Sequence, residues 1–232
     1  MRSLSFFFLI ILASVLEVSA QSAEQIMDRA RIAATLQNHD LHGTIRGGSN
    51  RGKTPIHLFL RGENIQFTTH NGARRFHMRL KDDHYDLLEI VDGKDRLFDS
   101  AKLRERVAGS DLTYEDLSMR FFYWPDAQLL GEERVGTHMC WKIRLNNPKR
   151  DGNYGVMYAW MHQKYGAFMK IEGFDRKGKR IKRFLVEDVM KLPDDTYTLA
   201  KMRVSSMDGE KTLSHSYLEF EKPTRAIPKG PR

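Results

Sequence analysis

Short runs of alternating apolar and polar side chains, separated by turn residues, dominate the chain from residue 56 onward. The runs Ile56–Arg61 and Phe76–Leu80 show the pattern clearly. A period of two residues is that of a β-strand with one buried face. The pairs Asn71-Gly72 and Asp92-Gly93 are turn signals that join neighbouring strands through short links. The pattern therefore predicts consecutive strands that pair antiparallel.

Runs of this kind recur almost to the C-terminus and predict about ten or eleven strands, near the upper limit for an open twisted sheet. Strand twist accumulates across so wide a sheet, so the sheet must curl into a barrel or a half-barrel. The other predicted strands are 65–68, 85–91, 129–135, 139–145, 156–161, 167–174, 181–192, 196–204 and 212–220.

One helix is expected before the first strand. Ser22 can cap its first turn, and Gln25 lies three residues later in the capping-box position. Apolar residues then recur at helical spacing. Asn38 and His39 are expected to end the helix.

The segment 97–124 is irregular, and with the helix it is the part of the chain left to cover one face of the sheet. The expected fold class is mainly β (α+β): a curved antiparallel half-barrel sheet with helices covering the concave face. No linker or repeat divides residues 21–232, which we expect to form a single domain. Residues 222–232 are basic and rich in proline, and are expected to be a loose tail.

Residues 1–20 have the pattern of a secretory signal peptide: a basic start, a short apolar run and small residues before the expected cleavage point. An uncleaved N-terminal anchor is the alternative. Cys140 is the single cysteine, so no internal disulfide can form, and its apolar neighbours predict a small buried side chain. No cysteine stands at the cleavage point, so the mature chain is expected to be soluble and without a lipid anchor there. An exported chain of this size without disulfides favours a bacterial periplasm.

The formal net charge is +8. A nucleic-acid partner is not expected for an exported chain. The charge could attract anionic lipid headgroups in a transient membrane-surface contact, or an acidic protein partner. An ordinary solvated surface is the third interpretation.

The stretch "AGSDLTYEDL", residues 108–117, holds the best candidates for acid chemistry: Asp111, Glu115 and Asp116. Asp111 could instead act as the N-cap of a short helical turn, with the other two acids in its first turn. We favour this structural interpretation, although a lipid-modifying enzyme that uses these acids remains an alternative. The histidines show no zinc-binding pattern and no nucleophile motif is present, so we expect no metal, no cofactor and no catalysis.

The chain is notable for its aromatic and methionine side chains. Residues 121–124 read Phe-Phe-Tyr-Trp, and the chain contains 11 methionines. Methionine is flexible and polarisable and lines surfaces that accept irregular apolar shapes. A curled sheet with one main helix has little else to fill its concave side, so we expect an apolar ligand to share that space.

Two segments resemble the LolA-like family of periplasmic lipoprotein carriers, in the branch of outer membrane lipoprotein-sorting proteins. They are "YAWMHQKYGAFMKIEGFDRKGK", residues 158–179, and "AGSDLTYEDLSMRFF", residues 108–122. The resemblance extends over most of the chain, from about Gln25 to Phe220. It implies an open half-barrel whose helices cover a hydrophobic cavity, and no catalysis.

The resemblance also implies a function in the periplasm of a Gram-negative bacterium. The protein would shield the acyl chains of lipoproteins or lipids and carry them from an inner-membrane donor towards an outer-membrane acceptor, as a monomer. A regulatory module that senses lipid or lipoprotein in the cell envelope is the alternative. The family further implies an arginine of the sheet that holds the lid closed, for which Arg46, Arg61 and Arg79 are the candidates by position.

Strand parity and the aromatic run select the side chains expected to line the cavity. They are Phe67, Phe76, Met78, Phe121, Trp124, Trp141, Tyr158, Trp160 and Phe168. An error of one residue in register would turn a whole strand's side chains to the opposite face.

Overall fold

The structure is a computed structural model that describes residues 21–35, 38–47, 50–69, 74–81, 84–149, 151–193 and 195–223. The expected signal peptide, the Asn71-Gly72 turn and the tail beyond residue 223 lie outside these residues.

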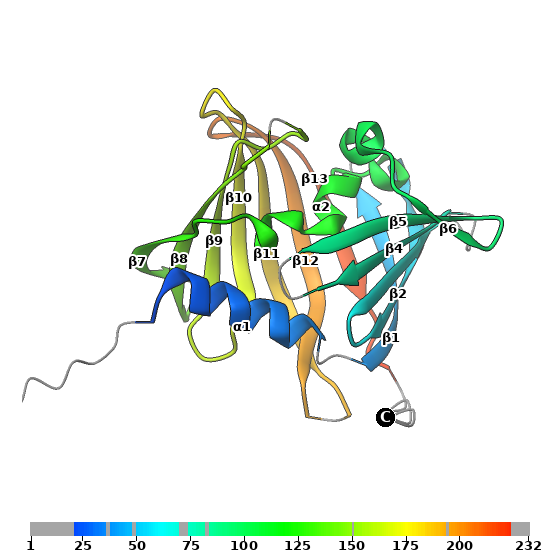
Figure 1. The fold of residues 1–232 in the computed structure, drawn as a ribbon, viewed down its shortest axis with the longest axis horizontal. Coiled ribbons are helices and arrows are strands. Elements are labelled where there is room, and N and C mark those ends of the chain that lie inside the picture. Colours follow the sequence, from blue (N-terminus) through cyan, green and yellow to red (C-terminus); the bar gives the residue numbers. More distant parts are fainter. Residues whose placement is uncertain are drawn as a thin grey trace, which may run out of the picture.

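One sheet of 13 strands forms the body of the molecule (Figure 1). The strands are β1 (Asn38–Gly47), β2 (Asn50–Arg61), β3 (Asn64–Thr69), β4 (Arg74–Leu80), β5 (Tyr85–Val91), β6 (Lys94–Leu97), β7 (Gln128–Val135), β8 (His138–Asn146), β9 (Val156–His162), β10 (Phe168–Phe174), β11 (Arg180–Lys191), β12 (Tyr197–Asp208) and β13 (Lys211–Phe220). The helical elements are α1 (Ala23–Thr35), η2 (Ser100–Arg104), η3 (Val107–Gly109), α2 (Tyr114–Ser118) and η4 (Arg120–Tyr123).

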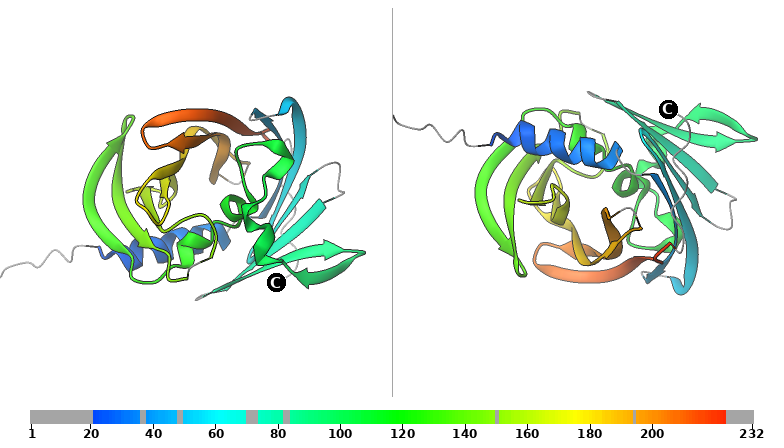
Figure 2. Two further views of the ribbon diagram at one scale, coloured as in Figure 1. Left: turned by 90° about the horizontal axis from the view of Figure 1, so that it is seen from above. Right: turned by 90° about the horizontal axis from the view of Figure 1, so that it is seen from below.

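The strand order is β6-β5-β4-β3-β2-β1-β13-β12-β11-β10-β9-β8-β7, and every neighbouring pair is antiparallel. The first and last strands therefore meet in the middle of the sheet. From β6 at one edge to β7 at the other, the chain crosses the concave side through η2, η3, α2 and η4 (Figures 1 and 2). The topology thus places this connecting segment inside the curve of the sheet.

The curved antiparallel half-barrel predicted from the sequence is confirmed, with helices on the concave side. Two strands were missed. β1 begins at Asn38, where the helix was expected to end, and two of its four buried positions are His39 and Gly43, so its buried face is not a regular series of apolar side chains. β6 is a four-residue edge strand whose side chains are all exposed, so it has no buried face to produce an alternating pattern.

Helix α1 begins as predicted. The Ser22 amide donates to Gln25 Oε1 at 3.0 Å and the Gln25 amide donates to Ser22 Oγ at 3.2 Å, which is a capping box. Ile26 and Met27 are buried against the sheet, and the helix lies across the open side of the curve (Figure 1). In the described part of the chain, no helix has both the length and the apolar character needed to cross a bilayer.

Candidate ligand-binding cavity

A cavity of about 520 Å³ lies between the concave face of the sheet, α1 and the connecting segment. Its volume is within the range of pockets that bind small molecules. Most of its lining is aliphatic, aromatic or methionine side chain. These lining residues include Leu41, Leu58, Leu60, Ile65, Phe67, Met78, Leu80, Leu112, Leu117, Phe121, Phe122, Met161, Phe168, Ile171, Phe184, Val186, Met202, Leu218 and Phe220.

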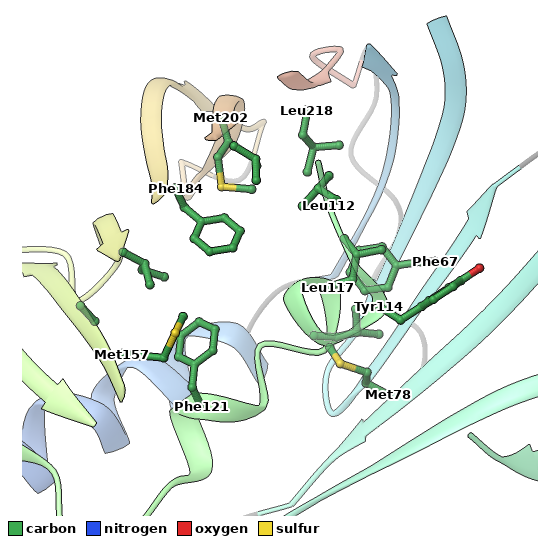
Figure 3. Packing of buried hydrophobic residues seen from close by; sticks show 14 of the residues in the cluster. Phe67, Met78, Leu112, Tyr114, Leu117, Phe121, Met157, Phe184, Met202 and Leu218 are labelled. Atoms are coloured by element: carbon green, nitrogen blue, oxygen red, sulfur yellow. The ribbon is translucent and has the colours of Figure 1, made fainter. Parts of the chain in front are cut away.

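The two arms of the sheet supply opposite walls. Phe67 and Met78 come from β3 and β4, whereas Phe184 and Met202 come from β11 and β12. Figure 3 shows these side chains pointing towards the same interior, with Phe121 of the connecting segment between the arms. They can converge because alternate residues of each strand point to the concave face. The cavity is therefore a product of the whole curve of the sheet.

The connecting segment is fixed by a short capped helix. Thr113 is the N-cap of α2: its hydroxyl accepts from the Asp116 amide at 3.2 Å, and Asp116 Oδ2 accepts from the Thr113 amide at 2.8 Å. The prediction that Asp111 is this N-cap is wrong. The capping box pairs Thr113 with the acid three residues later, and Asp111 lies two residues before this N-cap.

Asp111 attaches the segment to the middle of the sheet. Its buried carboxylate accepts hydrogen bonds from Ser206 of β12 at 2.7 Å, from Ser216 of β13 at 2.9 Å, and from Ser214. Burial alone would raise the pKa of Asp111. The three serine hydrogen bonds and the ammonium of Lys182 outweigh it and hold the pKa below its usual range.

Asp116 and Lys182 extend this buried network. Lys182 of β11 donates to the carbonyl oxygen of Asp111 and lies 3.2 Å from Asp116 Oδ2. The hydroxyl of the fully buried Tyr154 donates to Asp116 Oδ1. Lys182, a residue of the sheet, thus holds the connecting segment through the backbone oxygen of Asp111 and the carboxylate of Asp116.

Glu115 and Arg120 form a second buried pair, 2.7 Å apart, and Arg120 also contacts Asp151 at 3.0 Å. Burial raises the pKa of Glu115, although the Asn153 amide and the Arg120 guanidinium act against it. Gly152 approaches this pair so closely that a Cβ there would collide with both side chains, and its φ of +66° suits glycine.

All three acids considered for catalysis therefore have structural partners. Asp111 holds the sheet, Glu115 holds Arg120, and Asp116 caps α2 and pairs with Lys182. No three His, Cys, Asp or Glu side chains among the described residues are grouped closely enough to hold a metal ion. The apolar lining allows the cavity to enclose an apolar ligand.

Four of the residues predicted to line the cavity do so: Phe67, Met78, Phe121 and Phe168. Three others pack in the core without lining it. Phe76 stacks behind Phe67 with ring centroids 5.1 Å apart, while Trp124 is buried and Trp141 packs against the core cluster.

Tyr158 and Trp160 lie on the convex face, opposite to the prediction. The Trp160 indole donates to Glu133 at 2.7 Å, and the Lys170 ammonium lies 3.5 Å from its ring centroid. The alkyl stems of lysines can bury an aromatic ring on an outer surface. The large size of the Trp160 side chain therefore did not indicate on which face of the sheet it lies. The inward side chains of β9 are Met157, Ala159 and Met161, which are fully buried.

An arginine of α1 contacts the connecting segment, and sequence reasoning missed this contact. Arg31 donates to the carbonyl oxygen of Phe122 at 2.7 Å and lies over the Tyr123 ring at 5.5 Å. The sequence feature that could have indicated this contact is the position of Arg31 four residues after the buried Met27, which places both on the same side of the helix.

The three arginines considered for this role lie elsewhere. Arg46 pairs with Glu219, Arg61 pairs with Asp40, and Arg79 pairs with Asp95. None of the three lines the cavity.

The model of a protein family described as "Uncharacterized protein" matches residues 79–227, more than half of the chain. The chain belongs to this family. No curated protein sequence matches it significantly.

Solved structures of other proteins share the fold of this chain. A DUF1329 family protein from Desulfovibrio piger superposes with a TM-score of 0.67 at 15% identity, covering 87% of this chain and 92% of its own. A domain from Vibrio parahaemolyticus described as an outer membrane lipoprotein-sorting protein gives 0.65 at 15% identity, covering 86% and 92%. A LolA superfamily protein from Nitrosomonas europaea gives 0.64 at 17% identity, covering 90% and 96%. The fold of this chain is LolA-like.

Proposed function

We propose that this protein is a soluble periplasmic carrier that shields the acyl chains of lipoproteins or lipids in its cavity during transfer towards the outer membrane. The observation that carries the proposal is the apolar cavity of about 520 Å³ inside the curve of the sheet. Each methylene removed from water contributes about 0.8 kcal/mol, so an acyl chain needs such a host to cross an aqueous compartment.

The polar groups around the cavity support binding without catalysis. Asp116 is at the lining but is already bonded to Thr113, Tyr154 and Lys182. The aliphatic and methionine walls can adapt to chains of different length. The cavity therefore suits a flexible apolar ligand better than a rigid polar substrate.

Release requires that the cavity can open. Arg31 joins α1 to η4 through one hydrogen bond to the carbonyl of Phe122, and the two elements together cover the cavity. A single bond of this kind stabilises by about 1 kcal/mol, which thermal motion or a partner can overcome. We propose that separation of these elements admits and releases the acyl chain.

The N-terminal sequence and the likeness of fold support the proposed location and partners. The signal-peptide pattern of residues 1–20 supports export to the periplasm of a Gram-negative bacterium. One solved structure of the same fold is described as an outer membrane lipoprotein-sorting domain. An inner-membrane donor and an outer-membrane acceptor are the partners that such a carrier requires.

Native mass spectrometry of the protein purified from a Gram-negative periplasm, followed by lipid extraction, tests the proposal. We expect a co-purifying acylated species and, after its removal, uptake of a fluorescent fatty acid. A protein that carries no acylated molecule and takes up neither fatty acid nor lipopeptide would contradict the carrier function.

Two neighbouring positions on β11 provide a matched pair of variants for this experiment. Val186 lines the cavity, whereas Leu185 pairs with Arg203 and Lys170 on the convex face. Val186→Trp should block uptake because the indole occupies the cavity. Leu185→Trp adds the same side chain to the other face and should bind as the unmodified protein does.

A further inference from the structure

Three turns meet at one end of the cavity. The β8 start pairs with the β9 end through Cys140 and His162, and the β11 end pairs with the β12 start through Lys191 and Tyr197. The β7–β8, β9–β10 and β11–β12 turns therefore lie at the same end of the sheet, the lower end in Figure 1. We call the exposed side chains of Tyr165, Val189 and Tyr197 at this end the tyrosine rim.

The tyrosine rim exposes apolar surface beside the cavity. Tyr165 and Tyr197 are each 52% exposed and Val189 is 48% exposed, and all three also line the cavity. The two tyrosine rings lie 5.8 Å apart although they belong to different turns. Of the seven large hydrophobic side chains exposed in the described residues, three gather here, so this end differs from the rest of the surface.

Histidine contacts hold Tyr165 in place. His162 Nδ1 accepts from the amides of Lys164 and Tyr165 at 3.1 and 3.3 Å, and its ring lies 4.7 Å from the Tyr165 ring. Because Nδ1 is an acceptor, Nε2 carries the proton and donates to His138 Nδ1 at 3.2 Å. Burial and the neighbouring His138 lower the pKa of His162, which favours this neutral state. The turn is therefore ordered before any partner arrives.

The charge near the rim is positive. The Lys164 ammonium lies 5.3 Å from the centroid of the Tyr165 ring. Gly166 of the same turn lies against the side chain of Arg29, an exposed cation of α1. Of the exposed acids at this end, Asp195 is paired with Lys191 at 2.8 Å, and Asp188 accepts a hydrogen bond from the Val189 amide at 2.9 Å. Cations thus accompany the exposed tyrosines at this end.

We propose that the tyrosine rim is a docking surface for an anionic lipid bilayer. This inference rests on the proposed carrier function. Tyrosine favours the interface between hydrocarbon and headgroups, where its ring is buried and its hydroxyl stays hydrated, and lysine and arginine attract anionic headgroups. Docking at this end places the cavity against the bilayer, so an acyl chain can pass between the two without crossing water.

Co-sedimentation with vesicles tests the proposal. The purified protein should bind phosphatidylcholine vesicles that contain phosphatidylglycerol, more weakly at high salt and more weakly to phosphatidylcholine alone. The double variant Tyr165→Ser/Tyr197→Ser should lower the partition coefficient on the order of ten-fold. The double variant Leu97→Ser/Leu213→Ser removes comparably exposed apolar side chains, 79% and 59%, from β6 and β13 and should bind as the unmodified protein does.

A fluorescent fatty acid separates this proposal from the carrier function. A far-UV circular dichroism spectrum and a Tm that match those of the unmodified protein show that the tyrosine variant is folded, so that a loss of vesicle binding is assigned to the rim, and fatty-acid uptake is measured on the unmodified protein. The docking proposal is contradicted if the unmodified protein binds neither vesicle type, or if the tyrosine variant binds vesicles as strongly as the unmodified protein. Neither result would contradict the carrier function. Tyrosine-dependent vesicle binding without fatty-acid uptake would support docking while the carrier function fails.

Discussion

At the scale of single residues, Asp111 attaches the connecting segment to the middle of the sheet through several buried hydrogen bonds. Its carboxylate receives hydrogen bonds from Ser206, Ser214 and Ser216, on two central strands. The residue belongs to the segment that crosses the concave side, so these contacts join that segment to the sheet. A charged acceptor with several donors is among the stronger hydrogen-bonding arrangements in proteins.

Asp111→Asn should lower the free energy of unfolding by about 2–3 kcal/mol, because it removes a buried charge that three serine hydroxyls and Lys182 stabilise and replaces an acceptor atom by a donor. Urea denaturation measures the change. Asp195→Asn, at a side chain that is 82% exposed, is the control and should change stability little.

The pH dependence of this difference has a definite sign. The folded-state pKa of Asp111 is below its usual value, so its contribution is present above the unfolded pKa of about 4 and is lost as the pH falls through the folded pKa. The stabilities of the variant and the unmodified protein should therefore converge in acid. A gap that stayed constant down to pH 2 would contradict the role of the charge.

Cys140 gives a second prediction for a single residue. Its side chain is fully buried, and burial raises the pKa of the thiol to about 11. Since the thiolate is the reactive form, Cys140 should resist a thiol reagent at pH 8 in the folded protein and react at once in denaturant. Rapid labelling of the folded protein would show that β8 opens locally.

At the scale of elements, α1 and η4, which are far apart in sequence, together cover the cavity. We call these two elements the lid. α1 contributes Ala30 and Arg31 to the cavity lining, and η4 contributes Phe121, Phe122 and Tyr123. The Arg31 guanidinium connects the two pieces through the Phe122 carbonyl. The stability of the closed lid should therefore depend on a side chain that contributes little to the core.

Arg31→Gln should speed the release of a bound fluorescent fatty acid several-fold, since a lost hydrogen bond of about 1 kcal/mol corresponds to roughly five-fold in rate. Stopped-flow displacement by excess unlabelled fatty acid measures this rate. Glu24→Gln, at an exposed position of the same helix, is the control. Equal release rates for the three proteins would show that the lid opens elsewhere.

Strands were predictable from the sequence where one face of the strand is buried and the other is exposed to solvent. β4 alternates in this way, and its Phe76 and Met78 do face inward. β6 has no buried face and was missed. On β9 the parity was reversed because Trp160, the largest side chain, is buried on the convex face by lysines from neighbouring strands. Such contacts depend on the strand order, which alternation alone does not specify.

At the scale of the whole molecule, the cavity exists because a sheet of 13 strands curls around a connecting segment too small to fill it. The curl of the sheet was predictable from the number of strands and their twist. The sequence could not predict that β1 and β13 meet in the middle, which brings Leu41 and Leu218 into the same lining. Nor could it predict Arg31 as the lid contact, since this depends on where α1 crosses the concave side.

A ligand held in this cavity should stabilise the entire fold, because both arms of the sheet and the lid contact it. At a free ligand concentration of 100 times Kd, binding adds about 2.7 kcal/mol to the free energy of unfolding. For a domain of this size that corresponds to a rise in Tm of roughly 5–10 °C. Differential scanning calorimetry with a fatty acid or a lipopeptide measures it.

The two β11 variants decide whether such a rise comes from the cavity. Val186→Trp should abolish the rise, since the indole occupies the ligand's place, and Leu185→Trp should retain it because that side chain points to the convex face. The ligand-free Tm of Val186→Trp should stay close to that of the unmodified protein, because the cavity provides room for the larger side chain. Equal ligand-induced shifts in both variants would place the binding site outside the cavity and refute the carrier model at its central point.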